Sequence, residues 1–302
     1  MVYDVIVIGA GPAGMTAALY ARRAEKSVLV IEKETFGGKI NFSPKIENFP
    51  THAEISGSAF ADLLLAQVQA QGADIELDTV TAIAKNGDIF AVQGEFSAYE
   101  GRTVILATGA KHRMLGLEKE TELVGAGVCY CAVCDGAFYR GQKVAVIGGG
   151  NTALQDAILL ADLCEEVTVV QNLPELTGEK VLQARLRKLP NVRIITDAKV
   201  TQLCGEDALD GIHIQLGAGM QQRLDVTGVF VAIGQQPDNE AFRDYAALDD
   251  WGYIMADERC TTQTEGLFVA GDCRTKAVRQ IVTATADGAA AALAACRYLD
   301  AQ

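Results

Sequence analysis

The stretch Tyr3-Asp-Val-Ile-Val-Ile-Gly-Ala-Gly-Pro-Ala-Gly14 decides the fold of this 302-residue chain. Its apolar run ends at a glycine, which is typical of a buried strand. A helical pattern follows from Pro12 to about Ala24, and a second predicted strand, Ser27 to Ile31, ends in Glu32. In a unit of this kind the first glycine makes the turn, the second admits a pyrophosphate and the third lets helix meet strand. The stretch therefore predicts a dinucleotide-binding βαβ unit.

The expected ligand contacts follow from this unit. Gly9, Gly11 and Gly14 place the N-terminus of the helix against phosphate groups, and Glu32 is placed to accept hydrogen bonds from a ribose diol. Further along, the paired Gly37-Gly38 suits close passage of the backbone along a flat ligand. A plain loop would explain that pair equally well.

A second unit of the same design begins with the predicted strand Lys143 to Gly148. Gly148, Gly150 and Ala153 form G-x-G-x-x-A, with a helix expected over 152–164 and a strand over 167–170. Two such units suggest two dinucleotides, one bringing electrons in and one passing them on. The alternative is a second unit that keeps the fold but binds nothing.

The remaining pattern alternates helices and strands and places the chain in the α/β class. It predicts a helix over 58–71, antiparallel strands over 73–100, buried strands over 103–109 and 266–272, strands within 221–234 and a helix over 283–298. Asp272 follows the last strand, where a doubly wound sheet presents its ligand contacts. Arg279-Gln-Ile281 leads into the last helix, whose N-terminus favours a negatively charged group.

A C-x-x-C pair, Cys131 and Cys134, lies between the two units and is followed at once by Asp135. Two thiols at this spacing can close a disulfide, and exchange requires a thiolate and a nearby acid. Half of a zinc site is one alternative, but no second close pair of ligands accompanies it. Two unpaired core thiols are the other alternative.

Composition limits the function. The chain is 49% hydrophobic and 22% charged, ordinary for a globular protein, and is long enough for two domains. A net charge of −13 argues against binding nucleic acid or anionic membranes. No long apolar stretch and no signal peptide pattern is seen. We expect a cytoplasmic protein without a structural metal.

Together these motifs resemble the low-molecular-weight thioredoxin reductases along essentially the whole chain. The most specific is Cys131-Ala-Val-Cys-Asp-Gly136 between the two units. The other carriers are Gly9–Gly14, Glu32, Gly37-Gly38, Glu47–Pro50, Ala107–Gly109, Gly148–Gly150, Ala270–Asp272 and Arg279-Gln280.

The resemblance implies two Rossmann-like dinucleotide-binding domains, the second inserted in the first. An FAD-binding domain would comprise residues 1–114 and 246–302, an NAD(P)-type domain residues 115–245, and the chain would form a homodimer. The residues implied in FAD binding are Gly9, Gly11, Pro12, Ala13, Gly14, Glu32, Lys33, Gly38, Lys39, Asn48, Ala107, Thr108, Gly109, Gly271, Asp272, Arg279, Gln280 and Ile281.

The resemblance also assigns roles at the cysteine motif. Cys134 would face the flavin, Cys131 would attack the disulfide of a thioredoxin-like protein, and Asp135 would move the proton. The inserted domain would swing between two orientations about hinges near 112–116 and 244–248, so that disulfide and nicotinamide reach the flavin in turn.

Two positions depart from the family pattern. The usual glycine-glycine-glutamine is Gly37-Gly-Lys39. After Val170 the family has H-R-R-x-x-x-R, whose arginines hold the 2′-phosphate of NADPH. This chain has Gln171-Asn-Leu-Pro-Glu-Leu-Thr177 at that position, with no cationic residue. Because a 2′-phosphate usually needs such arginines, we expect NADPH to be a poor donor. The residues implied in a second nucleotide site are Gly148, Gly150, Asn151, Thr152, Ala153 and Gln171.

Two other donors are open. The run Leu173 to Val181 is similar to a loop in the NADH-using flavoprotein of the alkyl hydroperoxide system, and reduced ferredoxin serves thioredoxin reductases that lack the NADPH motif. We rank NADH first, because two acidic proteins approach each other slowly.

The rival functions are a flavin-dependent dithiol oxidase that uses oxygen, a non-enzymatic flavoprotein and an electron supplier to a peroxiredoxin. The intact glycine turn from Gly148 to Ala153 and the full cysteine motif favour a reductase.

Overall fold

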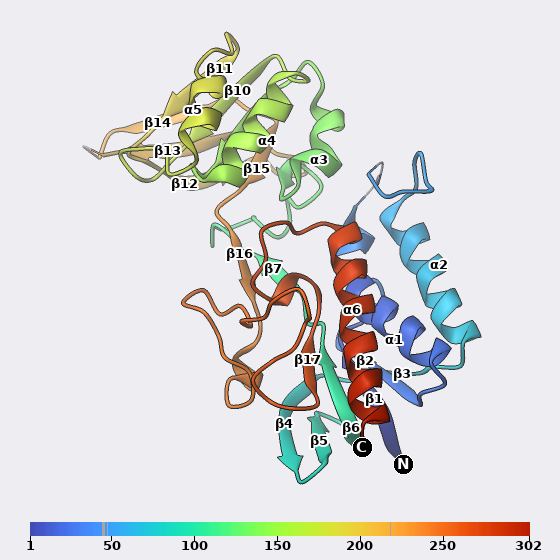
Figure 1. Cartoon of the computed structure of the whole chain (residues 1–302). Helices are drawn as coiled ribbons and strands as arrows, with labels where there is room; N and C mark the ends of the chain where they lie inside the picture. Colours follow the sequence, from blue (N-terminus) through green and yellow to red (C-terminus); the bar gives the residue numbers. More distant parts are fainter. Residues whose placement is uncertain (44–45, 47, 218) are drawn as a thin grey trace. The chain divides into compact units, whose positions relative to one another are not determined.

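The structure is a computed structural model that describes all residues except 44, 45, 47 and 218, and the side chain of residue 42. It consists of two compact units (Figure 1). Unit 1 comprises Met1–Lys111 and Gln236–Gln302, and unit 2 comprises His112–Gln235. The short strands β7 (Ala110–His112) and β16 (Gln235–Pro237) pair where the chain passes from one unit to the other and back.

Unit 1 is built on one mixed sheet. Its order is β3 (Asp74–Leu77), β2 (Val28–Glu32), β1 (Val2–Ile8), β6 (Ala98–Leu106), β5 (Ile89–Gly94) and β4 (Val80–Asn86), and β17 (Leu267–Val269) also pairs with β6. Strand β6 has three partners. It pairs with β1 in parallel, its first half pairs with β5 in antiparallel fashion, and its end pairs with β17 in parallel.

The antiparallel arrangement expected over residues 73–100 is wrong for the first strand of that segment. Strands β4, β5 and β6 are antiparallel, but β3 runs parallel to β2 and extends the nucleotide-binding part of the sheet. The helix α2 (Gly57–Ala70) makes the crossover between β2 and β3 that a parallel pair requires.

The helices of unit 1 lie around α1 (Pro12–Arg23), with α2 and the long α6 (Ile281–Asp300) against it (Figure 1). Helices α1 and α6 approach closely because small residues line their contact. A Cβ on Gly288 would lie 2.1 Å from the carbonyl oxygen of Ala13. The described part of unit 1 also contains the short 3₁₀ turns η1 (Gly38–Phe42), η3 (Glu240–Phe242) and η4 (Gly271–Cys273).

Unit 2 has two sheets. The first is parallel, in the order β11 (Val192–Ile195), β10 (Glu166–Val170), β9 (Lys143–Ile147), β15 (Gly228–Val231) and β8 (Val128–Cys129). The second is antiparallel, in the order β12 (Ala198–Cys204), β13 (Gly211–Leu216) and β14 (Gln221–Leu224). The helical segments are α3 (Ala132–Asp135), η2 (Gly136–Tyr139), α4 (Asn151–Ala161) and α5 (Lys180–Leu186).

The expected α/β class with two dinucleotide-binding βαβ units is confirmed, as β1–α1–β2 and as β9–α4–β10. Residues 236–245, expected in the inserted domain, belong to unit 1 in the structure. The reason is hydrophobic packing: Phe242 is 2% exposed and lies in one core cluster with Ile83 and Phe90. Within the described residues, no helix has both the length and the apolar character needed to cross a bilayer.

Candidate active site

The glycine-rich turn of unit 1 is shaped by steric contact. Gly9 has φ +105°, and a Cβ there would lie 2.4 Å from the carbonyl oxygen of Ala107. A Cβ on Gly14 would lie 1.8 Å from the carbonyl oxygen of Gly9, so α1 packs directly on the turn. Gly11, the N-cap of α1, is open by contrast, with no heavy atom nearer than 3.9 Å to an added Cβ. This cradle fits a pyrophosphate at a helix N-terminus.

Glu32 ends β2 and turns its carboxylate back toward the glycine turn. One oxygen accepts the N–H of Ala10 at 2.7 Å, and the other accepts the N–H groups of Lys33 and Glu34 at 2.9 Å. A carboxylate offers about four acceptor sites, so this buried group keeps capacity for a ribose hydroxyl.

Asp272 lies after β17 with one oxygen committed and one free. Its Oδ2 lies 3.3 Å from Nζ of Lys39. Its Oδ1 is buried and has no hydrogen-bond partner among the described residues. Buried acceptors are normally satisfied, so this atom is placed to receive a hydroxyl of a bound ligand. Lys39 and Asp272, both expected among the flavin-binding residues, are thus in contact with each other.

The turn that carries Asp272 is held by a buried ion network that sequence reasoning missed. The carboxylate of Asp287 on α6 accepts the N–H of Gly271 at 3.0 Å, two guanidinium N–H groups of Arg274 at 2.8 and 2.9 Å, and Nζ of Lys276 at 2.8 Å. Burial alone would raise the pKa of Asp287, but the hydrogen bonds and charges of Arg274 and Lys276 lower it below its usual value. Nothing in the local sequence pattern marks Asp287, because its partners come from another segment.

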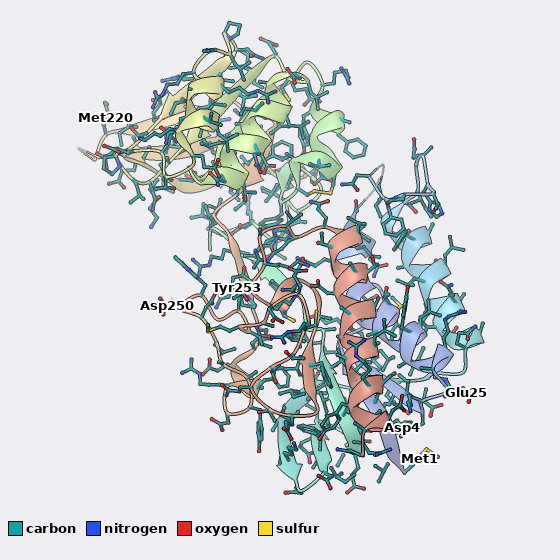
Figure 2. All side chains as sticks on the ribbon, in the orientation of Figure 1. Met1, Asp4, Glu25, Met220, Asp250 and Tyr253 are labelled. Carbon is teal, nitrogen blue, oxygen red and sulfur yellow. A yellow bond between two sulfur atoms is a disulfide. The ribbon has the colours of Figure 1, made fainter. Side chains whose placement is uncertain are left out.

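Arg279 stabilises the turn that carries Asp272. Its guanidinium lies over the ring of Tyr253, 4.1 Å from the centroid, and donates to the carbonyl oxygens of Asp272, Arg274 and Lys276 at 3.3–3.4 Å. Tyr253 is labelled in Figure 2. Arg279 therefore supports the binding turn through backbone contacts.

The N-terminus of α6 is also ordered by residues singled out from the sequence. Gln280 is the N-cap and forms a capping box with Thr283. Nδ2 of Asn48 donates to Oε1 of Gln280 at 2.9 Å, so the structure brings these two predicted residues together. Ile281 begins the helix. Glu47, a carrier of the family resemblance, lies outside the described residues.

The other predicted residues of unit 1 lie around the same strand ends. The hydroxyl of Thr108 donates to Asn239 at 3.0 Å, and Nζ of Lys33 pairs with Asp238 at 3.0 Å. A Cβ on Gly38 would lie 3.6 Å from Cα of Gly11. The residues fit FAD: a steric cradle for phosphates, a carboxylate for a ribose and an unsatisfied buried acceptor at a strand end.

In unit 2, Cys131 and Cys134 form a disulfide with a Cα–Cα distance of 5.3 Å. Cys131 is the N-cap of α3, and its sulfur accepts the N–H of Cys134 at 3.2 Å. The other six cysteines are free. Among the described residues, no group of His, Cys, Asp and Glu side chains is placed to hold a metal ion.

Asp135 ends α3 beside this disulfide. Burial raises its pKa to about 6, and a hydrogen bond with Cys129 opposes part of the rise. A carboxyl group that titrates near neutral pH can both give and take a proton during thiol exchange. Two apolar side chains here are exposed, Val133 between the two cysteines and Phe138 just after the motif, and they offer a contact surface for a partner.

The second glycine turn repeats the first one. Gly148 has φ +132°, and a Cβ there would lie 2.4 Å from the carbonyl oxygen of Ala232. Gly150 is the open N-cap of α4, and Ala153 is fully buried where the first unit has Gly14. The side chain of Asn151 exchanges two hydrogen bonds with Glu179, at 2.9 and 2.7 Å.

Gln171 follows β10 at the position where a ribose contact is expected. Its side chain is buried against Gly149, and its Nε2 donates to the carbonyl oxygen of Glu175 at 3.3 Å. The N–H groups of Thr177 and Gly178 both donate to the carbonyl oxygen of Gly149 at 2.8 Å. The loop after β10 therefore folds back on the glycine turn, and Thr152 remains exposed at the start of α4.

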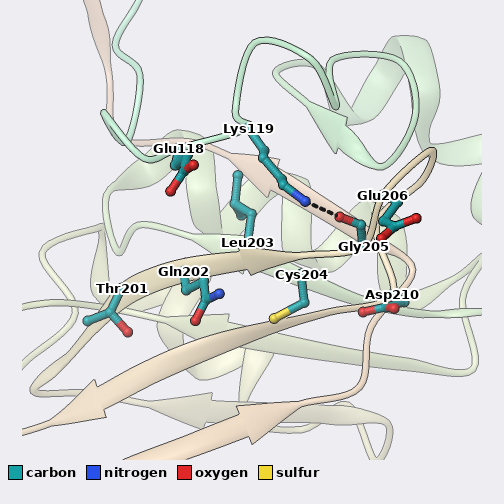
Figure 3. A pocket seen from close by; sticks show the side chains of 9 residues that line it. All are labelled: Glu118, Lys119, Thr201, Gln202, Leu203, Cys204, Gly205, Glu206 and Asp210. Carbon is teal, nitrogen blue, oxygen red and sulfur yellow. Dashed lines mark hydrogen bonds between the residues drawn. The ribbon is translucent and has the colours of Figure 1, made fainter.

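A polar pocket of about 670 Å³ also lies in unit 2 (Figure 3). Two of its lining residues are joined by a hydrogen bond, in which Nζ of Lys119 donates to the carbonyl oxygen of Gly205 at 2.9 Å. Its lining comprises Glu118, Lys119, Thr201, Gln202, Leu203, Cys204, Gly205, Glu206 and Asp210. None of the predicted site residues of unit 2 lines it, so it is separate from the second glycine turn and from the disulfide.

Comparison with known proteins defines the class. A family model described as pyridine nucleotide-disulphide oxidoreductase matches residues 3–288. The thioredoxin reductase of Treponema pallidum is 40% identical over 300 residues, covering 99% of this chain and 97% of the relative. The crystal structure of thioredoxin reductase from Streptococcus pyogenes superposes with a TM-score of 0.87 at 39% identity, covering 100% of this chain and 99% of the other.

The chain thus belongs to the pyridine nucleotide-disulphide oxidoreductase family. Within it, the chain is an FAD-dependent disulfide oxidoreductase similar to the low-molecular-weight thioredoxin reductases along its whole length. The relatives include the thioredoxin reductase of Listeria monocytogenes, 38% identical over 301 residues, covering 99% of this chain and 94% of the relative.

Proposed function

We propose that the protein is a thioredoxin-disulfide reductase that passes electrons from a nicotinamide donor, through FAD, to the Cys131–Cys134 disulfide and on to a thioredoxin-like protein. The observation that carries the proposal is the disulfide at the start of α3, followed at once by a half-buried carboxyl whose pKa lies near neutrality. The exposed Val133 and Phe138 beside it support a protein substrate.

Each residue has one task in this scheme. FAD, when bound, supplies two-electron exchange between a nicotinamide and a disulfide. The cradle at Gly9–Gly14 and the carboxylates of Glu32 and Asp272 hold it. Cys134 receives the electrons, Cys131 attacks the substrate disulfide, and Asp135 takes a proton from the attacking thiol and returns one to the leaving thiolate.

We further propose that NADH is the nicotinamide donor and that NADPH is used poorly. The nine residues from Gln171 to Glu179 contain no Lys, Arg or His and include Glu175 and Glu179. A 2′-phosphate usually needs an arginine fork, whereas an unphosphorylated ribose needs an acceptor. The amide N–H of Gln171 is committed to Glu175, which leaves its Oε1 to accept from the ribose diol.

The proposal also includes a homodimer and a reorientation of the inserted domain. The resemblance supports a homodimer with FAD and NAD(P)-type domains, in which the inserted domain reorients where the chain passes between the two units, near 112–116 and, in place of the expected 244–248, at 235–236. Reduced ferredoxin remains the second candidate donor, and a thioredoxin-like protein the substrate.

One experiment tests the proposal and its rivals together. The FAD-loaded protein is mixed without oxygen with NADH, NADPH or reduced ferredoxin, and flavin bleaching is followed by stopped flow. Reduction of thioredoxin with a supporting donor is then measured for the wild type and for Cys131→Ser. The proposal requires fast bleaching by NADH and loss of thioredoxin reduction in the variant.

Other outcomes would assign the rival functions. Bleaching by ferredoxin alone would make the second nucleotide unit a relic. Rapid bleaching by small dithiols, with peroxide formed in air and no response to any nicotinamide, would identify a dithiol oxidase.

A further inference from the structure

A buried carboxylate, that of Glu120, joins two parts of unit 2 that are separate in the sequence. The first part is the entry segment, defined here as residues 112–117, with which the chain enters unit 2. The second part is Tyr130, which lies between the end of β8 and Cys131. The proposed function uses neither Glu120 nor Tyr130, so the contacts between them call for a separate explanation.

The carboxylate of Glu120 binds the backbone of the entry segment. It is 1% exposed, and its Oε1 accepts the N–H of Leu115 at 2.8 Å. Its Oε2 accepts the N–H of Gly116 at 2.8 Å and that of Leu117 at 3.4 Å. The side chains of Leu115 and Leu117 pack against a hydrophobic core cluster of unit 2. Residues 115–117 are thus fixed to unit 2 through both their backbone and their side chains.

Tyr130 contacts the entry segment both directly and through Glu120. Its hydroxyl donates to Oε1 of Glu120 at 2.9 Å. Burial and this hydrogen bond raise the pKa of Tyr130, so its phenol stays protonated and donates at neutral pH. The ring of His112 stacks on the ring of Tyr130, with 5.2 Å between the centroids and 24° between the planes. Both ends of the entry segment are therefore held by the residue next to Cys131.

The backbone on each side of Tyr130 is also fixed. The preceding strand, β8, is buried and pairs in parallel with β15. Cys131 follows Tyr130 directly and is the N-cap of α3. A change in the direction of the entry segment must therefore carry Tyr130 and Cys131 with it or break the contacts of Glu120.

We propose that Glu120 and Tyr130 are positioning residues that join the entry segment to the Cys131–Cys134 disulfide as one rigid body. The reorientation of the inserted domain then bends the chain between Lys111 and His112, where one compact unit gives way to the other, instead of within 112–116. The inference rests on the proposed function, in which this reorientation separates two electron-transfer steps. The two residues hold the disulfide at a fixed distance from the bend, so that each reorientation delivers it to the same place.

The test compares Glu120→Gln and Tyr130→Phe with the wild type. Unit 1 offers a matched control in Asp78, a carboxylate that is 4% exposed. It accepts two backbone N–H groups at 3.2 and 3.1 Å and the hydroxyl of Tyr99 at 3.0 Å. Asp78→Asn and Tyr99→Phe therefore remove the same kinds of hydrogen bond without touching the entry segment.

The first readout is amide hydrogen exchange of the FAD-loaded proteins. In Glu120→Gln the amides of residues 115–117 should exchange roughly 10-fold faster, because an NH₂ group replaces an oxygen that accepted their N–H groups. Tyr130→Phe keeps the stacked ring but removes the donor, so the same amides should exchange about 3-fold faster. Asp78→Asn and Tyr99→Phe should leave the exchange of residues 115–117 unchanged.

The second readout is thioredoxin reduction in the steady state with a supporting donor. In Glu120→Gln kcat should fall about 10-fold, since misplacement of a reacting group by about 1 Å can cost roughly 10²-fold. The KM for thioredoxin should stay near the wild-type value, because Val133 and Phe138 are unchanged. The reduced dithiol should react with the small disulfide DTNB at the wild-type rate, because that single turnover needs no reorientation. Asp78→Asn should keep the wild-type kcat.

Unchanged exchange of residues 115–117 in Glu120→Gln overturns the inference, and so does an equal rise in Asp78→Asn. A wild-type kcat in Glu120→Gln despite faster exchange also overturns it, because the contacts would then be only structural. If Glu120→Gln does not fold, Tyr130→Phe decides by the same two readouts. If the wild type reduces no thioredoxin, the proposed function fails, whereas the exchange rates still decide whether Glu120 and Tyr130 hold the entry segment.

Discussion

Replacement of Asp287 by asparagine should destabilise the protein more than any other single loss of charge in unit 1. The side chains of Asp287, Lys276 and Arg274 are 7%, 6% and 3% exposed, so the network is shielded from water. Asparagine keeps the volume of the side chain but places an NH₂ group among donors and leaves two buried cations without their anion. The next carboxylate, Glu258, lies 3.7 Å from Arg274 and is 97% exposed, so it compensates little.

The magnitude follows from that geometry. Removing one partner of a buried ion pair costs about 3–5 kcal/mol, a large part of a typical stability of about 5–15 kcal/mol. Urea unfolding of the FAD-loaded protein should show a lower midpoint at an unchanged slope. Asp300→Asn is the matched control on the same helix, because its pair with Lys26 is exposed and should contribute no more than about 1 kcal/mol.

The pH dependence gives a second check. The folded state lowers the pKa of Asp287, so the unfolded state binds more protons in the acid range. Its contribution is complete above the ordinary aspartate pKa of about 3.9 and disappears as the pH falls through the lower folded-state value. The gap between wild type and Asp287→Asn should close there. A loss near neutral pH no larger than that of Asp300→Asn would refute the reasoning.

Three further predictions concern the site. The purified protein should be yellow with one FAD per chain, and Asp272→Asn should weaken FAD binding about tenfold, because a charge-assisted hydrogen bond is lost. Fluorescence titration of the apoprotein with FAD measures this affinity. An unchanged affinity would remove Asp272 from the FAD site. Cys131→Ser should abolish thioredoxin reduction while the donor still bleaches the flavin, and Asp135→Asn should slow exchange roughly 10²–10⁴-fold; full activity in Cys131→Ser would exclude the redox assignment. The kcat/KM for NADH divided by that for NADPH should exceed one. The double variant Asn172→Arg with Thr177→Arg should lower this ratio by strengthening NADPH use. A wild-type ratio below one would contradict the donor proposal.

The sequence by itself determined the two nucleotide-binding units and the redox pair. Glycine spacing acts within one turn and its flanking strand and helix, so Gly9–Gly14 and Gly148–Ala153 specify their geometry locally. The same holds for Cys131 and Cys134, whose separation of three residues suffices for a disulfide. Such short-range patterns predict local structure without knowledge of the rest of the fold.

Only the tertiary structure decided which groups surround those motifs. Asp287 meets Gly271 because α6 packs back on the sheet, and Tyr139 reaches Cys129 because Gly228 admits its ring. Likewise β3 proved parallel because its partner β2 lies across a helical crossover. Residue spacing carries no signal for such contacts, since they form between segments that are brought together by burial of apolar surface.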